Sequence, residues 1–131
     1  MDAKKILLVD DEAAIRKMVK AVLNDARYSF TEASNGLEAQ VFLEREHYDL
    51  IISDVIMPDC DGIELVMTIR RRFPDVKVVM MSGGGRVRAG HYLDLAGKLG
   101  AAKVFEKPFD TAELREAVKG LLFNEPIVEC E

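Results

Sequence analysis

Short runs of apolar residues alternate along this chain with longer segments in which apolar and polar positions recur at helical spacing. A continuous apolar run is typical of a strand that is buried on both faces of a parallel sheet. The pattern predicts strands at five places: Ile6–Val9, Ser29–Ala33, Leu50–Ile52 ending at Ser53-Asp54, Val76–Met81 and Val104–Phe105.

The segments between and after these strands have the apolar spacing of amphipathic helices. The first helix is predicted from about Glu12 to Asp25, and the second is predicted to end near Glu46. The apolar residues that mark the helices are Ile15, Met18, Val19, Val22 and Leu23 in the first; Leu37, Val41 and Leu43 in the second; Ile63, Val66, Met67 and Ile69 in the third; Leu93, Leu95 and Leu99 in the fourth; and Leu114, Val118 and Leu121 in the last.

Local signals add to this description of the helices. Either Asp110 or Thr111 can cap the last helix. The triplet Arg70-Arg71-Arg72 is expected at a helix C-terminus, where positive charge complements the helix dipole. The helical methionines Met18 and Met67 are expected to lie in the core.

Five strand–helix units in series predict an α/β protein with one parallel sheet and helices on both faces. Because crossovers between parallel strands are right-handed, few topologies remain. We expect the flavodoxin-like, doubly wound (βα)5 fold with strand order 2-1-3-4-5. In such sheets ligands bind at the carboxyl ends of the strands, so the polar residues at those ends are the candidates for function.

Composition narrows the class of protein. The 131 residues suit one domain, and 49% hydrophobic with 31% charged residues is ordinary for a soluble globular protein. The net charge of -5 disfavours direct nucleic-acid binding, and no apolar run approaches the ~18 residues of a membrane span. No signal peptide is visible, and the only cysteines are Cys60 and Cys130, so we expect a cytoplasmic location.

Polar residues stand where four of the predicted strands end. Asp10-Asp11 follow the first strand, Asp54 the third, Ser82 the fourth and Lys107 the fifth. Clustered carboxylates repel one another unless a cation compensates them, and oxygen ligands of this kind suit Mg²⁺. A lysine and a hydroxyl beside them can bind an anion. The set therefore predicts phosphoryl transfer to a nucleophilic aspartate.

Several short motifs occur in order along the chain: Ile6-Leu7-Leu8-Val9-Asp10-Asp11, Asp54 with Met57-Pro58 and Asp61-Gly62 after it, Met81-Ser82-Gly83, and Lys107-Pro108-Phe109. Together they resemble the receiver domains of bacterial two-component response regulators, over Lys4 to about Leu122. The resemblance implies a receiver domain over residues 1–122, like that of stand-alone chemotaxis-type regulators. Residues 123–131 are then expected to form a short tail with no output domain.

The resemblance also implies roles for the residues at the strand ends. By similarity Asp54 is the phosphoacceptor. Asp11 and Asp54 bind Mg²⁺ directly, together with the backbone carbonyl of Ile56, whereas Asp10 acts through water.

The remaining two site residues are implied to contact the phosphoryl group itself. Lys107 neutralises its charge, and Ser82 moves to hydrogen-bond it. The phosphoryl donor is expected to be a phosphohistidine on a sensor histidine kinase or on a histidine phosphotransfer protein. The output is expected to be contact with a downstream protein target or onward relay, without direct binding of nucleic acid or membrane.

Two other functions stay open from the residues alone. A Mg²⁺-dependent phosphohydrolase with an aspartyl-phosphate intermediate would need a general acid near its nucleophile, and Ile56 offers none. A phosphorylation-independent interaction module is disfavoured by the joint presence of Asp11, Asp54, Ser82 and Lys107. We therefore expect a signalling protein that catalyses only its own phosphorylation and dephosphorylation, and is not otherwise an enzyme.

The sequence departs from the family pattern at a few positions. Val104 stands where tyrosine or phenylalanine is common, and the Gly83–Gly90 segment is longer than in many relatives. That segment is either a tolerated insertion or a surface for a specific partner. Ile56 and Gly84 occupy the two positions that orient the hydrolytic water in the family, and neither carries a polar side chain. Slow autodephosphorylation is the consequence that we predict.

Overall fold

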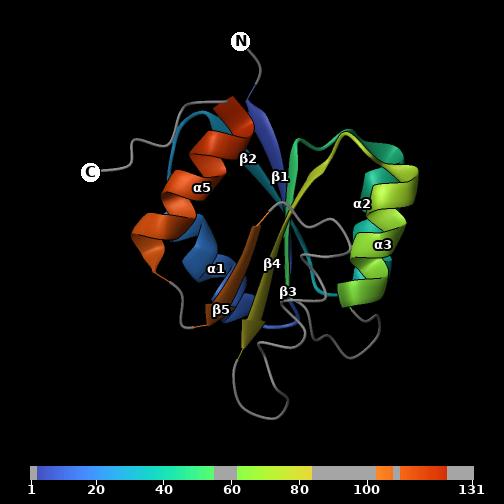
Figure 1. Ribbon diagram of the computed structural model, residues 1–131, viewed down its shortest axis with the longest axis horizontal. Helices are drawn as coiled ribbons and strands as arrows, with labels where there is room; N and C mark the ends of the chain where they lie inside the picture. The colour runs from blue at the N-terminus through green and yellow to red at the C-terminus, as the bar shows by residue number, and fades with distance from the viewer. Residues whose placement is uncertain (1–2, 55–61, 84–102, 108–109, 124–131) are drawn as a thin grey trace.

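The computed structural model describes residues 3–54, 62–83, 103–107 and 110–123. Its centre is a parallel sheet of five strands in the order β2-β1-β3-β4-β5, as the sequence predicted (Figure 1). The strands are β1 (Lys4–Val9), β2 (Tyr28–Ala33), β3 (Leu50–Asp54), β4 (Lys77–Gly83) and β5 (Lys103–Lys107).

Helices cover both faces of the sheet. The described helices are α1 (Ala13–Val22), α2 (Gly36–Arg45), α3 (Gly62–Arg72) and α5 (Thr111–Phe123). In Figure 1, α1 and α5 lie on one face, and α2 and α3 lie on the other. The helix predicted around Leu93 and Leu99 lies outside the described residues. No helix in the described ranges is long and apolar enough to cross a membrane.

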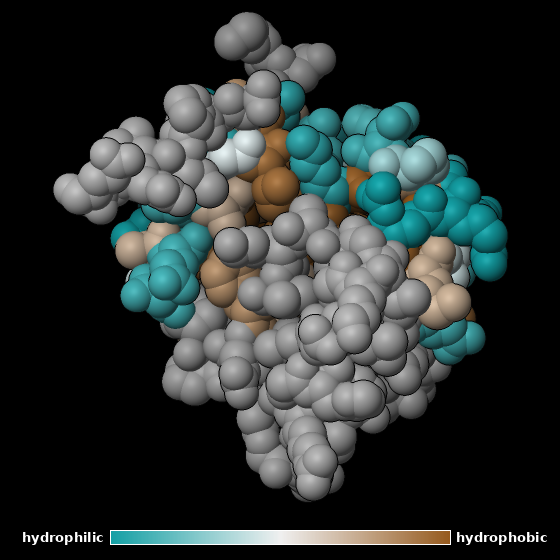
Figure 2. Space-filling view, viewed as in Figure 1, coloured by the Kyte–Doolittle hydropathy of each residue, from teal (hydrophilic) through white to brown (hydrophobic). Residues whose placement is uncertain are grey.

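The core is divided into two layers by the alternation of side chains along the strands. Leu7 and Val9 of β1 pack in the layer under α2 and α3, whereas Ile6 and Leu8 pack in the layer under α1 and α5. All four side chains are at most 2% exposed. Burial of each such aliphatic side chain contributes about 1.5–3 kcal/mol, so both faces of the sheet stabilise the fold. Figure 2 shows hydrophobic residues between the helical layers and mostly hydrophilic residues over α2 and α3.

Side-chain caps fix the starts of two helices. Asp110 caps α5, since its Oδ1 accepts hydrogen bonds from the backbone N–H groups of Ala112 at 2.8 Å and Glu113 at 3.1 Å. The sequence allowed either Asp110 or Thr111 as the cap. The structure shows that Asp110 is the cap and that Thr111 is the first residue of the helix. Asn35 caps α2 in the same way, with its Oδ1 2.8 Å from the backbone nitrogen of Glu38.

The prediction that Met18 and Met67 lie in the core is wrong. The two residues are 39% and 48% exposed. On α1 the sheet is contacted by Val19 and its neighbours one turn away, so Met18, one position earlier, is rotated toward solvent. In α2, likewise, the buried positions are Gly36, Ala39 and Leu43. Of the three apolar residues that predicted this helix, two are exposed, namely Leu37 (60%) and Val41 (45%).

The arginine triplet lies in the last turn of α3, as predicted. Arg70 Nη1 donates to the carbonyl oxygens of Pro74 and Val76, both at 3.3 Å. Arg72 forms an ion pair with Glu44 of α2 at 2.8 Å. Arg70 and Arg72 therefore connect the end of α3 to the following turn and to α2.

Candidate functional site

Asp10 is the first residue after β1, and both its backbone and its side chain form hydrogen bonds. Its backbone N–H donates to the carbonyl of Ala33 at 3.1 Å, which extends the ladder between β1 and β2 by one residue. Its side chain is 1% exposed, and Oδ1 accepts a hydrogen bond from the backbone N–H of Glu12 at 2.9 Å. The carboxylate is therefore fixed inside the turn that leads to α1.

Asp54 is the last residue of β3 and is 6% exposed. The sheet pairs Val9 of β1 with Ser53 of β3, so Asp10 and Asp54 follow at the same level of neighbouring strands. Adjacent strands lie about 4.8 Å apart, and the register therefore brings these two acidic residues to one edge of the sheet.

The backbone places two further predicted residues at this edge. Met81 pairs with Asp54, and Ser82 is the next residue along β4. Lys107 ends β5 and pairs with Gly83 of β4. Four neighbouring strands thus bring Asp10, Asp54, Ser82 and Lys107 to the carboxyl edge of the sheet, whereas Ile56 lies outside the described residues.

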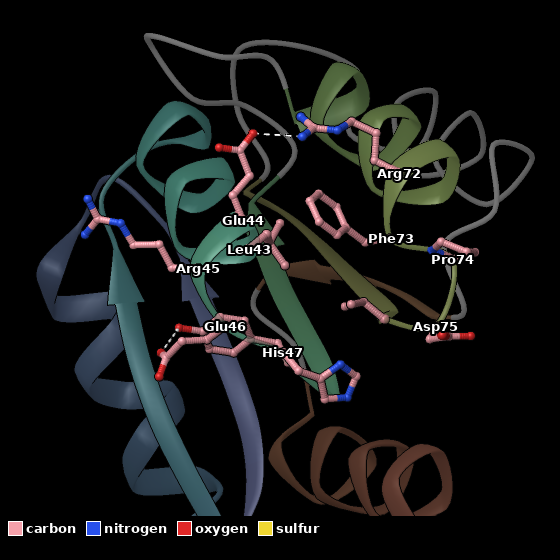
Figure 3. Close-up of a pocket in the computed structure, with 11 residues that line it drawn as sticks. Leu43, Glu44, Arg45, Glu46, His47, Arg72, Phe73, Pro74 and Asp75 are labelled. Carbon is pink, nitrogen blue, oxygen red and sulfur yellow. Dashed lines mark hydrogen bonds and ion pairs between the residues drawn. The ribbon is translucent and has the colours of Figure 1, made fainter.

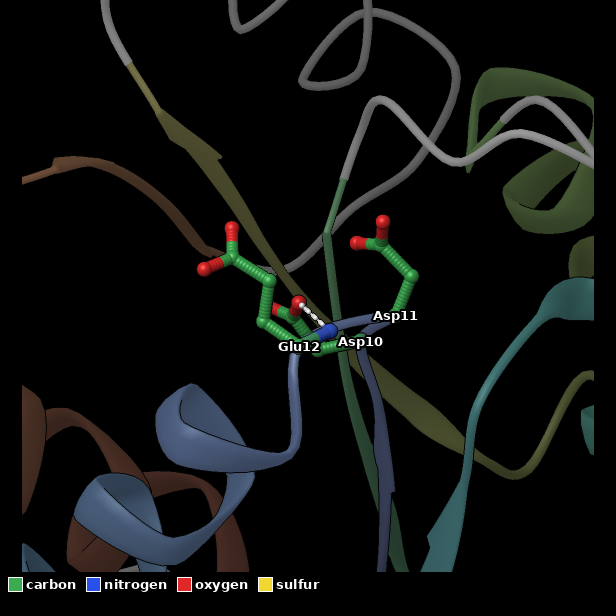
Figure 4. A group of neighbouring side chains, drawn as sticks. All are labelled: Asp10, Asp11 and Glu12. Carbon is green, nitrogen blue, oxygen red and sulfur yellow. Dashed lines mark hydrogen bonds between the residues drawn. The ribbon is translucent and has the colours of Figure 1, made fainter.

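Three acidic side chains gather in the turn between β1 and α1 (Figure 4). Ligand oxygens of Asp10, Asp11 and Glu12 all lie within 4.8 Å of one another, with Asp10 buried and the other two exposed. Within the described part of the chain, Asp54 is not a member of this group. Sequence reasoning missed Glu12, although it directly follows the aspartate pair, because it was assigned only as the start of a helix.

The donor set fits a hard divalent cation. Three carboxylates that share one small volume repel one another, and buried Asp10 and Asp54 have little water to screen them. A cation at this edge relieves both effects. Mg²⁺ usually keeps several bound water molecules and takes few protein ligands. A group of carboxylates in which two of the three are exposed to solvent suits this ion for that reason.

A cavity of about 420 Å³ opens at the opposite edge of the sheet, between the C-terminal ends of α2 and α3 (Figure 3). Two interactions join residues of its lining. Glu44 binds Arg72 at 2.8 Å, and Tyr48 Oη donates to Glu46 at 3.0 Å. Since this edge carries the amino ends of the strands, the cavity is remote from the acidic turn and separate from the candidate site.

The sequence and the fold of this chain match known proteins. Residues 6–119 match the family model described as the response regulator receiver domain, and the chain belongs to this family. The sporulation initiation phosphotransferase F of Bacillus subtilis is 35% identical over 119 residues, which are 91% of this chain and 94% of that protein. Receiver domains of two-component response regulators are phosphorylated on an aspartate and interact with sensor kinases and phosphotransfer partners.

A solved structure adds a ligand-bound relative. The response regulator protein TrrA from Thermotoga maritima, solved in complex with Mg²⁺-BeF, is 35% identical with a TM-score of 0.78, covering 91% of this chain and 99% of that one. Other relatives are longer. The response regulator protein PilR of Pseudomonas aeruginosa is 36% identical over 118 residues, and the chain spans only 26% of its length.

Proposed function

We propose that Asp54 is the phosphoacceptor of this receiver domain. The observation that carries the proposal is the register of β1 against β3, which sets the nearly buried Asp54 at the level of the acidic turn that begins at Asp10. The unit that performs this reaction spans residues 1–122 in our proposal.

The acidic edge also supports a magnesium site. Asp11 and Asp54 would hold Mg²⁺ with the backbone carbonyl of Ile56, while Asp10 would act through a bound water. When bound, Mg²⁺ supplies positive charge that offsets the carboxylates and the incoming phosphoryl oxygens. TrrA, which was solved with Mg²⁺-BeF, supports this assignment by similarity.

The protein's own groups would carry out the transfer. A carboxylate oxygen of Asp54 forms a bond to phosphorus while the bond from phosphorus to the donor's imidazole nitrogen breaks, and the electron pair stays on that nitrogen. Lys107 would neutralise the phosphoryl oxygens, and Ser82 would donate a hydrogen bond to one of them. Both residues belong to strands that end at the same edge as Asp54.

The donor in this proposal is a sensor histidine kinase or a histidine phosphotransfer protein, and the chain itself acts in the cytoplasm. The phosphorylated chain then contacts a downstream protein target or passes the group to another histidine. Its only catalytic activities are its own phosphorylation and dephosphorylation.

Intact-mass measurement tests the assignment of Asp54. Incubation with acetyl phosphate and Mg²⁺ should add one phosphoryl group to the wild type and none to Asp54→Asn. Asp75→Asn is the matched control, because Asp75 is an exposed aspartate at the opposite edge of the sheet and should label like the wild type. Undiminished labelling of Asp54→Asn would refute the assignment.

A further inference from the structure

Arg16 links the acidic turn to the neighbouring strand. Its Nη1 donates to the backbone carbonyl of Asp10, and its Nε donates to Glu32 Oε1 of β2 at 3.0 Å. The Arg16 side chain is only 16% exposed. One guanidinium therefore holds the first residue of the turn and is itself held by a carboxylate on β2.

Arg16 lies near the N-terminus of α1, where a positive charge is unusual. It follows three residues after α1 begins at Ala13, and the first turn of this helix contains no acidic residue. The helix dipole disfavours a cation near a helix N-terminus. A helical side chain tilts toward the N-terminus, however, so this position lets the guanidinium reach back to the carbonyl of Asp10.

Glu32 binds two cationic side chains, those of Arg16 and Lys20. Its second oxygen, Oε2, accepts a hydrogen bond from Lys20 Nζ at 2.9 Å. The hydrogen bond from Lys20, followed by the one from Arg16, lowers the pKa of Glu32 below its usual value. Glu32 therefore stays ionised at neutral pH and anchors Arg16.

We propose that Arg16 is a positioning residue for the magnesium site, an inference that rests on the proposed function. By fixing the Asp10 carbonyl, Arg16 fixes the turn from which the Asp10 and Asp11 side chains extend. Glu32 supports this arrangement from β2. Arg16 itself does not bind the metal, and it acts through the backbone of the turn.

The charge of Arg16 and its positioning role have opposite effects on metal affinity. A guanidinium close to the site repels Mg²⁺, so removing it would tighten binding if only charge mattered. Loss of a residue that orients metal ligands weakens binding by about 10–100-fold. The direction of the change therefore distinguishes the two effects.

Calorimetric titration with Mg²⁺ measures this direction, and it suits a chain that contains no tryptophan. We expect Arg16→Met to weaken Mg²⁺ binding by about tenfold. Lys20→Met is the matched control, because it removes the other cation on Glu32 and leaves the contact between Arg16 and Asp10 in place. Its affinity should stay close to that of the wild type.

Hydrogen exchange of the Glu12 amide gives a readout without metal. This N–H donates to Asp10 Oδ1, so it reports the geometry of the turn directly. In the metal-free protein we expect faster exchange of the Glu12 amide in Arg16→Met than in Lys20→Met. If Arg16→Met does not fold, Glu32→Gln, which weakens the anchor of Arg16, replaces it in both measurements.

The two proposals fail in different ways. Absence of Mg²⁺ binding and of acetyl-phosphate labelling in the wild type would overturn the proposed function, and the positioning role with it. If the wild type binds and labels as expected, then an Arg16→Met protein with unchanged or tighter Mg²⁺ binding overturns the positioning role alone. Weaker binding together with faster Glu12 exchange supports it.

Discussion

Asp10 and Asp54 lie side by side at the carboxyl ends of β1 and β3, each one residue past the pairing of Val9 with Ser53. Because both carboxylates are nearly buried, at 1% and 6% exposure, water screens them poorly. The sheet register thus gathers negative charge at one edge, where a divalent cation would be attracted and where β5 also ends in Lys107.

The first prediction concerns the metal ligands of the turn. Asp11→Ala should weaken Mg²⁺ affinity by at least about tenfold, or about 1.4 kcal/mol, because a cation with few protein ligands loses one of them. The same change removes carboxylate repulsion within the group of Asp10, Asp11 and Glu12, so stability of the metal-free protein should rise. Calorimetric titration and urea unfolding measure the two effects.

Glu12→Gln is the control for this prediction. Glu12 belongs to the acidic group. The ligands in our proposal are Asp11, Asp54 and the carbonyl of Ile56, so Glu12 would add negative charge near the site without binding the metal directly. Its variant should keep near wild-type affinity, apart from the loss of one nearby negative charge. Equal Mg²⁺ affinity of Asp11→Ala and the wild type would show that Asp11 is not a ligand.

The site could be predicted from the sequence to the extent that strand ends determine it. Each buried strand is an apolar run that stops at a polar residue, and a parallel sheet brings such ends together. This reasoning located Asp10 and Asp54 correctly at one edge. It did not locate the contact from Arg16 to the Asp10 carbonyl, because that contact depends on the tilt of a side chain and on a partner from β2.

The helical faces were predicted less well than the helices themselves. Apolar spacing identifies a helix, but neighbouring positions on it differ by about 100°, and only the packed structure decides which of them contacts the sheet. Ala39 is buried whereas Leu37 and Val41 are exposed, because the face of α2 that contains Gly36, Ala39 and Leu43 is the one turned toward the core. Hydrophobicity alone does not carry this information.

The second prediction concerns the cap of α5. Asp110→Ala should lower the free energy of unfolding by about 1 kcal/mol, because two backbone N–H groups, those of Ala112 and Glu113, lose their acceptor. Thr111→Ala is the matched control and should have a smaller effect, since Thr111 is the first helical residue. Urea unfolding at neutral pH compares them, and equal losses in the two variants would contradict the assigned cap.

The third prediction is a pH dependence at Asp25. The side chain of Arg27 donates hydrogen bonds to this carboxylate and, with the Arg27 backbone N–H, lowers the pKa of Asp25 from 3.8 to about 2. Because the folded-state pKa is the lower one, the contribution to stability is complete above 3.8 and is lost as the pH falls toward 2.

Unfolding of Asp25→Asn across the acid range tests this dependence. The variant should lose stability relative to the wild type at neutral pH and converge with it at the acid end. The effect should be small, since the pair is exposed to solvent. Asp75→Asn, which changes an exposed aspartate elsewhere, should run parallel to the wild type. A constant difference between Asp25→Asn and the wild type at every pH would contradict the prediction.

The last prediction concerns the lifetime of the phosphorylated state. Hydrolysis needs a water molecule in line with the bond between Asp54 and phosphorus, and polar side chains can orient that water. By resemblance the relevant positions are Ile56 and Gly84, which lie outside the described residues and carry no polar side chain. Autodephosphorylation should therefore be slow, which suits relay to another protein.

After removal of the donor, Ile56→Asn and Gly84→Glu should each release phosphate faster than the wild type, whereas Ile56→Val, which stays apolar, should not. If all three variants release phosphate at the wild-type rate, other features of the chain control the access of water.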